Sequence, residues 1–162
     1  GVRGRGYDVE DLQRELARIL GVDRTWKAVV VGAGRLGSAL TSYREFRNQG
    51  FYIVAVFDVD ESKLGRRIGD CEILPVQQLQ DYSERESIAV GIIATPQAAA
   101  QDAADCLVGG GVRAILNFAP GALDVPPGIT VRNVNLAIEL EGLTFAIADA
   151  DNRQAAGDGE PD

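Results

Sequence analysis

The residues best suited to chemistry form a glycine-rich segment that follows a run of β-branched residues. Residues 27–32 read as a strand buried on both faces, and a helix is expected over residues 36–48. Between them the chain fits the pattern G-x-G-x-x-G, in which the glycines permit a tight turn, close approach of the backbone to a pyrophosphate, and close packing of helix on strand. Free amides at the helix start then stabilise the phosphates. The predicted phosphate-binding residues are Gly32, Ala33, Gly34, Arg35, Leu36 and Gly37.

A carboxylate lies where such a turn needs a second ligand contact. Asp58 ends the apolar run 51–58 and follows Gly37 at about the 20-residue distance at which dinucleotide-binding domains carry an acidic residue for the adenosine ribose. A carboxylate there repels a 2′-phosphate, and Val59 and Asp60 supply no arginine to accommodate one. The sequence therefore favours NAD(H) over NADP(H), with Asp60 as an ordinary loop residue.

Two later strand ends offer the remaining contacts, because ligands of open α/β sheets bind beyond the carboxyl ends of the strands. Thr95 and Asn117 provide hydrogen-bonding groups for the ribose or carboxamide of the nicotinamide half, while Pro96 and Phe118 stand beside them. Phe118 offers an apolar wall. The alternative for each is a plain strand-end turn residue. No lysine, tyrosine or carboxylate accompanies them as an obvious proton donor, so binding fits better than turnover and no catalytic residue is predicted.

The elements that position these residues alternate along the chain. Helices are expected from about Asp8 to Gly21, over 36–48 and over 97–108, and the expected strands cover residues 27–32, 51–58, 72–75, 88–94, 114–117 and 130–133. This alternation indicates an α/β fold, a Rossmann-type doubly wound parallel sheet in one domain. Leu12, Leu16 and Ile19 predict that the first helix packs by one face.

The last part of the chain is different in kind. A helix over residues 135–148 carries apolar side chains on several sides, so we expect it to be buried against two surfaces. It either covers the sheet edge or inserts into a partner subunit. Residues 149–162 are polar and acidic and are expected to be a disordered tail. The predicted domain boundaries are thus 1–7 for a linker, 8–148 for the dinucleotide-binding domain and 149–162 for the tail.

Composition excludes several classes of function. The chain of 162 residues contains no histidine, which rules out a Ser-His or Cys-His pair and a conventional zinc site, so no metal is expected. Cys71 and Cys106 are far apart and read as reduced structural thiols. No apolar stretch reaches the length of a membrane span, and no leader is recognisable, which makes the cytoplasm the expected compartment.

Charge argues against direct binding of nucleic acid by the domain as a whole. A net charge of −8 repels a phosphate backbone, so contact with DNA has to come from elsewhere. The local exception is the glycine-rich start of the chain, where Arg3 and Arg5 either touch phosphate or belong to a solvated linker. Because methionine is absent even at position 1, we expect an N-terminal portion to be missing.

With these pieces in place, the chain resembles the Rex family of bacterial redox-sensing repressors. The resemblance runs over residues 1–148. It is carried by Gly-Val-Arg-Gly-Arg-Gly-Tyr-Asp-Val at 1–9, by the glycine motif, by Phe-Asp-Val-Asp at 57–60, and by Asn-Phe-Ala-Pro at 117–120 with Leu-Asp-Val-Pro at 123–126.

The resemblance implies a homodimer that senses NADH and NAD and is not an enzyme. It implies an N-terminal winged-helix domain, absent from this chain, that binds operator DNA when NADH is low and joins through the segment around Arg3 and Arg5. Binding of NADH would close the dimer and release the DNA, and the final helix would be exchanged between subunits. Asn135 stands where the family is expected to carry Asp at the start of that helix, which puts in doubt a charge-based part of the switch at that position.

Two alternatives remain open. One is an NAD-dependent oxidoreductase whose substrate domain is missing. The other is a CoA-binding module of the kind found in acyl-CoA synthetases, which uses a similar glycine turn. The acidic Asp58 counts against the second alternative.

Overall fold

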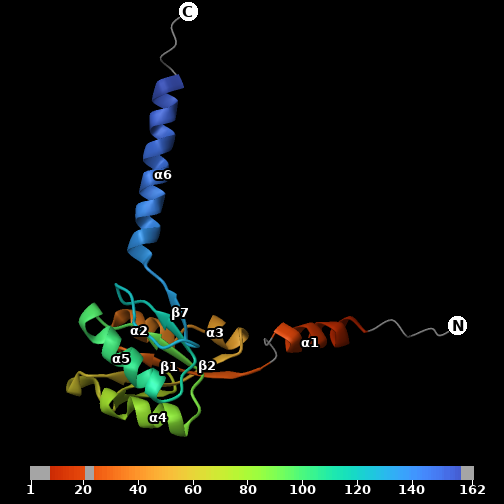
Figure 1. The fold of residues 1–162 in the computed structure, drawn as a ribbon, viewed down its shortest axis with the longest axis vertical. Helices are drawn as coiled ribbons and strands as arrows, with labels where there is room; N and C mark the ends of the chain where they lie inside the picture. The colour runs from red at the N-terminus through yellow and green to blue at the C-terminus, as the bar shows by residue number, and fades with distance from the viewer. Residues whose placement is uncertain (1–7, 21–23, 158–162) are drawn as a thin grey trace, which may run out of the picture.

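The centre of the molecule is a twisted sheet, seen in the computed structural model that describes residues 8–20 and 24–157 (Figure 1). Among these residues, seven strands form one sheet in the order β3-β4-β2-β1-β5-β6-β7. The pair β3 and β4 is antiparallel and every other neighbouring pair is parallel. The strands are β1 (Trp26–Val31), β2 (Phe51–Asp58), β3 (Arg67–Ile68), β4 (Cys71–Pro75), β5 (Val90–Ile93), β6 (Ala114–Asn117) and β7 (Thr130–Asn133).

Helices cover both faces of the sheet, as the predicted doubly wound fold requires. On one face, Leu79 of α4 and Leu107 of α5 join a core cluster with Val29 and Val31 of β1. On the other face, α2 and α3 pack over β1 and β2, where Val30 belongs to a second cluster. The helices are α1 (Val9–Leu20), α2 (Arg35–Thr41), α3 (Glu45–Asn48), α4 (Leu79–Arg85), α5 (Gln97–Gly109) and α6 (Leu136–Gly157), with 3-10 turns η1 (Glu61–Lys63) and η2 (Val76–Gln78).

The strand β1 lies at the middle of the sheet because it is apolar on both sides. Its residues 28–31 are all buried, which explains why the run lacks the alternation of a half-exposed strand. β1 pairs with β2 on one side and with β5 on the other, so the chain reverses its direction of winding at this point. A ligand crevice is expected where the loops after β1 and β5 diverge. The fold class predicted from the sequence is confirmed.

The predicted helix over residues 36–48 is wrong in its length, because the chain forms two short helices there. The Thr41 hydroxyl donates to the Gly37 carbonyl at 2.7 Å, a side-chain bond of the kind that bends helices. The Tyr43 amide then bonds the Leu40 carbonyl at 3.1 Å, three residues back, and the helix ends.

Two elements were not predicted. The strand β3 has only two residues, too few for a hydrophobic pattern, and it forms a hairpin edge beside β4. The helix α4 connects β4 to β5 and buries Leu79 and Ser83. Its sequence is mostly polar, which hides its single buried side from a search for apolar periodicity.

The first helix forms as expected but does not pack by its apolar face on this domain. None of the residues of α1 is buried, and Figure 1 shows the helix extending away from the sheet. Leu12 and Leu16 on its apolar side are half exposed, and Ile19 is more exposed still. The predicted linker at 1–7 and the predicted helix stop at Gly21 lie outside the described residues.

The last helix is longer than predicted, and the expected disordered tail is wrong for the residues up to Gly157. α6 continues through them because alanines at 148, 150, 155 and 156 favour helix. The Arg153 guanidinium also lies 2.9 Å from the Asp149 carboxylate, although such an exposed pair adds only about 0.3–0.5 kcal/mol. Residues 158–162 lie outside the described part.

The expectation that α6 is buried against two surfaces is not met within one chain. The helix projects from the domain beyond β7, and none of its residues is buried (Figure 1). Its large apolar side chains are all exposed by more than half, and they are Leu136, Ile138, Leu140, Leu143, Phe145 and Ile147. No helix among the described residues is long and apolar enough to cross a membrane.

Candidate functional site

The glycine turn after β1 is held by backbone contacts that admit only glycine at two positions. Gly32 has a φ of +106°, and a Cβ there would lie 2.5 Å from the Ala94 carbonyl oxygen. A Cβ on Gly37 would overlap the carbonyl oxygen of Gly32, so this glycine lets α2 lie against the turn. The first and third glycines of the motif therefore shape the protein itself.

Gly34 differs from its two neighbours in the motif because the space beside it is open. A Cβ on this residue would meet no atom within 4 Å, and its backbone is extended with a φ of −76°. The first backbone bond of α2 joins the Ser38 amide to the Gly34 carbonyl at 2.9 Å, so the amides of residues 35–37 precede it. Such amides lack partners within the helix and can donate to a phosphate. The turn thus fits a pyrophosphate group.

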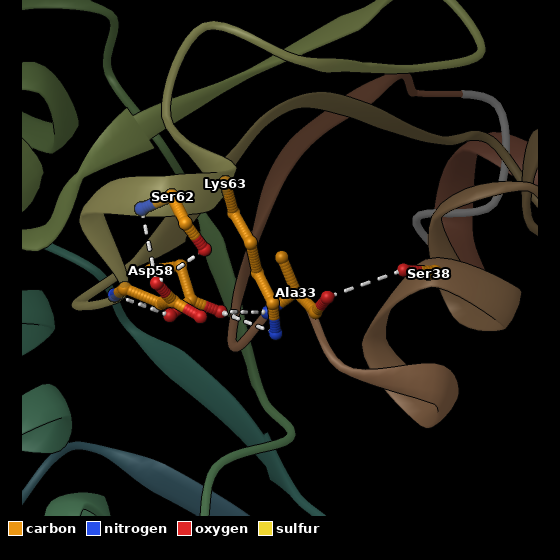
Figure 2. Close-up of polar contacts among 6 residues, drawn as sticks. Ala33, Ser38, Asp58, Ser62 and Lys63 are labelled. Atoms are coloured by element: carbon orange, nitrogen blue, oxygen red, sulfur yellow. Dashed lines mark hydrogen bonds and ion pairs between the residues drawn. The ribbon is translucent and has the colours of Figure 1, made fainter.

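The end of β2 is tied to this turn by a carboxylate. One oxygen of Asp58 accepts from the Ala33 amide at 2.7 Å, and the other accepts from the Asp60 amide at 2.8 Å (Figure 2). These two bonds fix the carboxylate orientation, and each oxygen keeps a lone pair for a further donor. A sugar hydroxyl group entering the crevice is a donor of the required kind.

A cation stands beside Asp58 that sequence reasoning missed. The Lys63 ammonium group lies 3.9 Å from the same carboxylate oxygen that bonds Ala33 (Figure 2). It comes from η1, which begins where Asp60 accepts from both the amide and the hydroxyl of Ser62. These bonds to Ser62 hold the pKa of Asp60 below its usual value. Asp60 therefore shapes the loop, in line with the expected role, while its turn carries Lys63 toward the site.

A cleft of about 580 Å³ opens at the predicted crevice. It is lined by the loops after β1, β2 and β5 together with residues of η1, η2 and α5. Five of the predicted residues line it, and these are Gly32, Gly34, Asp58, Thr95 and Pro96. The Thr95 hydroxyl donates to the Pro96 carbonyl at 3.0 Å and keeps its acceptor lone pairs.

The other predicted residues lie around the cleft without lining it. Arg35 and Leu36 are exposed at the start of α2, and the Ala33 amide is used by Asp58. Gly37 is buried in the packing of α2. Phe118 packs against the core cluster that contains Ala33.

Asn117 differs from its expected role. Its side chain is fully buried, its Nδ2 donates to the carbonyl of Ala119 at 3.2 Å and to Asn133 Oδ1 at 3.0 Å, and its Oδ1 accepts the Ala119 amide at 3.0 Å. The side-chain amide predicted to meet the ribose or carboxamide of the nicotinamide half is therefore bonded to the protein itself.

Several residues that line the cleft belong to no recognised sequence motif, but those on α5 recur at helical spacing. The residues of α5 that line the cleft are Ala99, Asp102, Ala103 and Cys106, and their spacing places them on one side of a helix. The small side chains leave room above this side, while Val59 and Val76 supply apolar walls. Helical spacing combined with small size was the signal that could have identified this wall.

The two cysteines remain thiols. Burial raises the pKa of the Cys106 thiol, and the neighbouring carboxylates of Asp102 and Asp105 raise it further. Burial likewise raises the pKa of Cys71, whose Sγ lies 3.2 Å from the Ile53 carbonyl. Both are free cysteines, in line with the expected structural role. Within the part of the chain that the structure describes, no cluster of three or more acidic, cysteine or histidine side chains is suited to a metal.

The different surroundings of the glycines give a first prediction. Gly34→Ala should fold normally but lose about 10-fold or more in dinucleotide affinity, because its methyl group projects into the open space above the turn. Gly37→Ala should lower the free energy of unfolding by about 3 kcal/mol, since overlap with backbone outweighs a helix-propensity gain of about 1 kcal/mol. Urea unfolding and calorimetric titration measure the two effects. An unfolded Gly34→Ala variant would contradict the assignment.

The pairing of Asp58 with Lys63 gives a second prediction. Asp58→Ala should weaken NADH binding by about 10- to 100-fold, because charge-assisted bonds to the ribose are lost. It should also raise the affinity for NADPH relative to NADH, since Lys63 is left as an unopposed cation for the 2′-phosphate. Glu61→Ala, which removes an exposed carboxylate from the same loop, serves as the matched control and should change neither affinity. Equal effects of the two substitutions would refute a direct ribose contact.

Comparison with known proteins identifies the family. The sequence profile of the CoA binding domain matches residues 23–121. The chain is 51% identical over 148 residues to the redox-sensing transcriptional repressor Rex of Desulforamulus reducens, covering 91% of this chain and 70% of that protein. It is 52% identical over 147 residues to the Rex protein of Carboxydothermus hydrogenoformans, covering 91% and 71%.

Solved structures agree with the sequence relatives. RSP, a Rex-family repressor, has been solved in complex with beta-NADH, and that structure matches with a TM-score of 0.81 at 35% identity over 93% of this chain and 73% of that one. Its complex with beta-NAD+ and operator DNA matches with a TM-score of 0.83 at 34% identity over 99% and 74%.

The profile and the relatives describe the same unit, because the CoA binding domain corresponds to the C-terminal NAD-binding domain of Rex proteins. The relatives are named as transcriptional repressors rather than enzymes. With this identity, this coverage and this fold, the chain belongs to the Rex family of redox-sensing transcriptional repressors.

Proposed function

We propose that this chain is the NADH-sensing part of a transcriptional repressor that releases operator DNA when NADH binds. The observation that carries the proposal is the Asp58 carboxylate, oriented by the Ala33 amide beside an open glycine turn. That arrangement suits a dinucleotide with a free 2′-hydroxyl. A relative of the same family has been solved with NADH, and with NAD+ and operator DNA.

The bound dinucleotide would lie across the carboxyl edge of the sheet. The turn at residues 32–37 would hold the pyrophosphate, and Asp58 would accept from the adenosine ribose. Val59 and Val76 with the small residues of α5 would enclose the adenine in the apolar part of the cleft. Thr95 and Pro96 then mark the nicotinamide half, with Phe118 nearby. The protein would respond to whether the bound nicotinamide is reduced, as in NADH, or oxidised, as in NAD.

Discrimination between the two redox forms has to arise at the nicotinamide ring. Oxidised nicotinamide carries a positive charge and the reduced ring is neutral, whereas both ligands share the pyrophosphate and ribose contacts. A pocket that excludes water favours the neutral ring. The ligand can shift the protein only by the difference between its affinities for the two conformations.

Titration calorimetry of this chain with NADH, NAD+, NADPH and CoA tests the binding half of the proposal. We expect NADH to bind tightest, NAD+ next, and NADPH and CoA weakly. CoA affinity comparable to that of NADH would support the CoA-binding alternative instead. A steady-state assay with carbonyl substrates tests the oxidoreductase alternative, and the sensor assignment expects no NADH consumption.

We propose that two copies of the chain form a homodimer by exchanging α6. The apolar side chains of this helix have no cover within their own chain, since all six are more than half exposed. On the face of the sheet that carries α2 and α3, a groove of about 380 Å³ lies open beside α3, over β1, β2, β5, β6 and β7. Its lining is mostly apolar and includes Ile53, Val90, Ile92 and Leu116. A helix with apolar groups on several sides suits such a groove in a second copy.

The exchange predicts that charge on α6 abolishes the dimer. A Leu140→Asp, Leu143→Asp double variant should sediment as a monomer at concentrations where the unaltered chain is dimeric, because two carboxylates would have to be buried. Gln154→Asp adds a charge to the same helix beyond its apolar residues and should leave the dimer intact. Sedimentation velocity measures both, and an intact dimer in the double variant would rule out the exchange.

DNA contact is proposed to come from an N-terminal domain that precedes residue 8 in the whole protein. The chain spans about 70% of the length of the relatives described above. Its net charge of −8 disfavours a phosphate surface on the domain itself. The exposed apolar side of α1 suits packing against such an added domain. Since operator DNA is the proposed partner, the proposed compartment is the cytoplasm.

A further inference from the structure

Asn117 is a fully buried polar residue at the carboxyl end of β6. Within its own loop it forms a closed turn, because its Oδ1 accepts the Ala119 amide at 3.0 Å and its Nδ2 lies 3.2 Å from the Ala119 carbonyl. Burial of an amide costs free energy unless each polar atom is paired. An apolar residue in the same space would leave the buried Ala119 amide unpaired, so the Asn117 side chain holds the loop as well as filling space.

The same side chain reaches the segment that leads into α6. Asn117 Nδ2 donates to Asn133 Oδ1 at 3.0 Å, and the Asn117 carbonyl accepts the Val134 amide at 2.8 Å. Asn135 follows directly, and its Oδ1 accepts the Ile138 amide at 3.1 Å as the cap of the helix. Only two residues therefore separate the bonded Asn133 from the first residue of α6.

On its other side the loop is attached to the elements that form the nucleotide cleft. The Phe118 amide donates to the Ile93 carbonyl at 2.8 Å, directly before the cleft residues Ala94 and Thr95. Further along, Gln101 of α5 bonds both the amide and the carbonyl of Asp124, each at 2.8 Å. The loop is therefore bonded directly to the strand that ends at the cleft residues Ala94 and Thr95.

We propose that Asn117 is a positioning residue that joins the loop at residues 118–121 to the root of α6 through Asn133, and so transmits the state of the nicotinamide site to the dimer helix. The inference rests on the proposed function and deepens it. The side-chain bond between the two asparagines is the element that differs between the two conformations, kept in one and broken in the other. Both the bound ligand and the position of α6 bias it, which is the physical requirement for coupling.

The test uses the full-length repressor and an operator duplex selected with it from a random pool. Asn133→Ala removes the side-chain acceptor of Asn117 Nδ2 but leaves its carbonyl acceptors at Ala119 and Gly121, and Asn133 is itself exposed. We expect NADH affinity and operator affinity without ligand to stay within about 2-fold, while the NADH-induced drop in operator affinity shrinks by about 5-fold or more. Fluorescence anisotropy with and without NADH measures this ratio.

Two further variants separate positioning from general damage. Asn133→Asp keeps an oxygen acceptor for Asn117 and should retain the NADH effect of the unaltered protein. Asn152→Ala, an exposed asparagine far along α6, is the matched control and should change nothing.

The inference is overturned if Asn133→Ala keeps the full NADH effect, or if it loses NADH or ligand-free operator affinity outright. Failure of the proposed function has a different signature, because the unaltered protein would then select no duplex or show no response to NADH.

Discussion

The hydrogen bond from the Ala33 amide to the Asp58 carboxylate is the contact on which the rest of the site depends. It joins the turn after β1 to the end of β2 at 2.7 Å, and it fixes the direction in which the remaining lone pairs of the carboxylate point. The turn can take this position because Gly32 adopts a positive φ and Gly37 lets α2 approach. One bond therefore sets the relation between the amides proposed to bind the phosphates and the carboxylate proposed to bind the ribose.

The sheet separates the surfaces for ligand and partner. The cleft proposed to bind the nucleotide lies at the carboxyl edge and runs along α5, whereas the open apolar groove lies on the face that carries α2 and α3. Strand β6 contributes to both regions, since Leu116 lines the groove and Asn117 begins the loop near the cleft. A signal between the two surfaces has only the thickness of the sheet to cross.

Sequence reasoning identified those residues of the candidate site whose positions follow from spacing along the chain. The glycine motif and Asp58 were predictable because their spacing along the chain reflects the geometry of one strand-helix-strand unit. Lys63 was missed because its position depends on how η1 folds after Asp60. Asn117 was predicted to contact the ligand because it lies at a strand end that faces the crevice. Its side chain is instead buried, and that burial depends on the path of the following loop.

The same limit explains the errors at the helices. A backbone bond from Tyr43 to Leu40, three residues back, ends a helix that apolar spacing alone would continue. The helix α4 has one buried side in a mostly polar sequence, so a search for apolar periodicity does not find it. The apolar sides of α1 and α6 were correctly recognised, but the sequence of a helix does not identify the surface that packs against it. Periodicity identifies such a face without naming its partner.

The apolar residues of α6 are not covered by their own subunit, and this exposure can make the stability of the repressor depend on its concentration. If the apolar residues of α6 are sheltered only by a second copy, unfolding includes dissociation, and the melting temperature rises with protein concentration. Newly made chains would then be most vulnerable to aggregation and proteolysis at low copy number, before they dimerise.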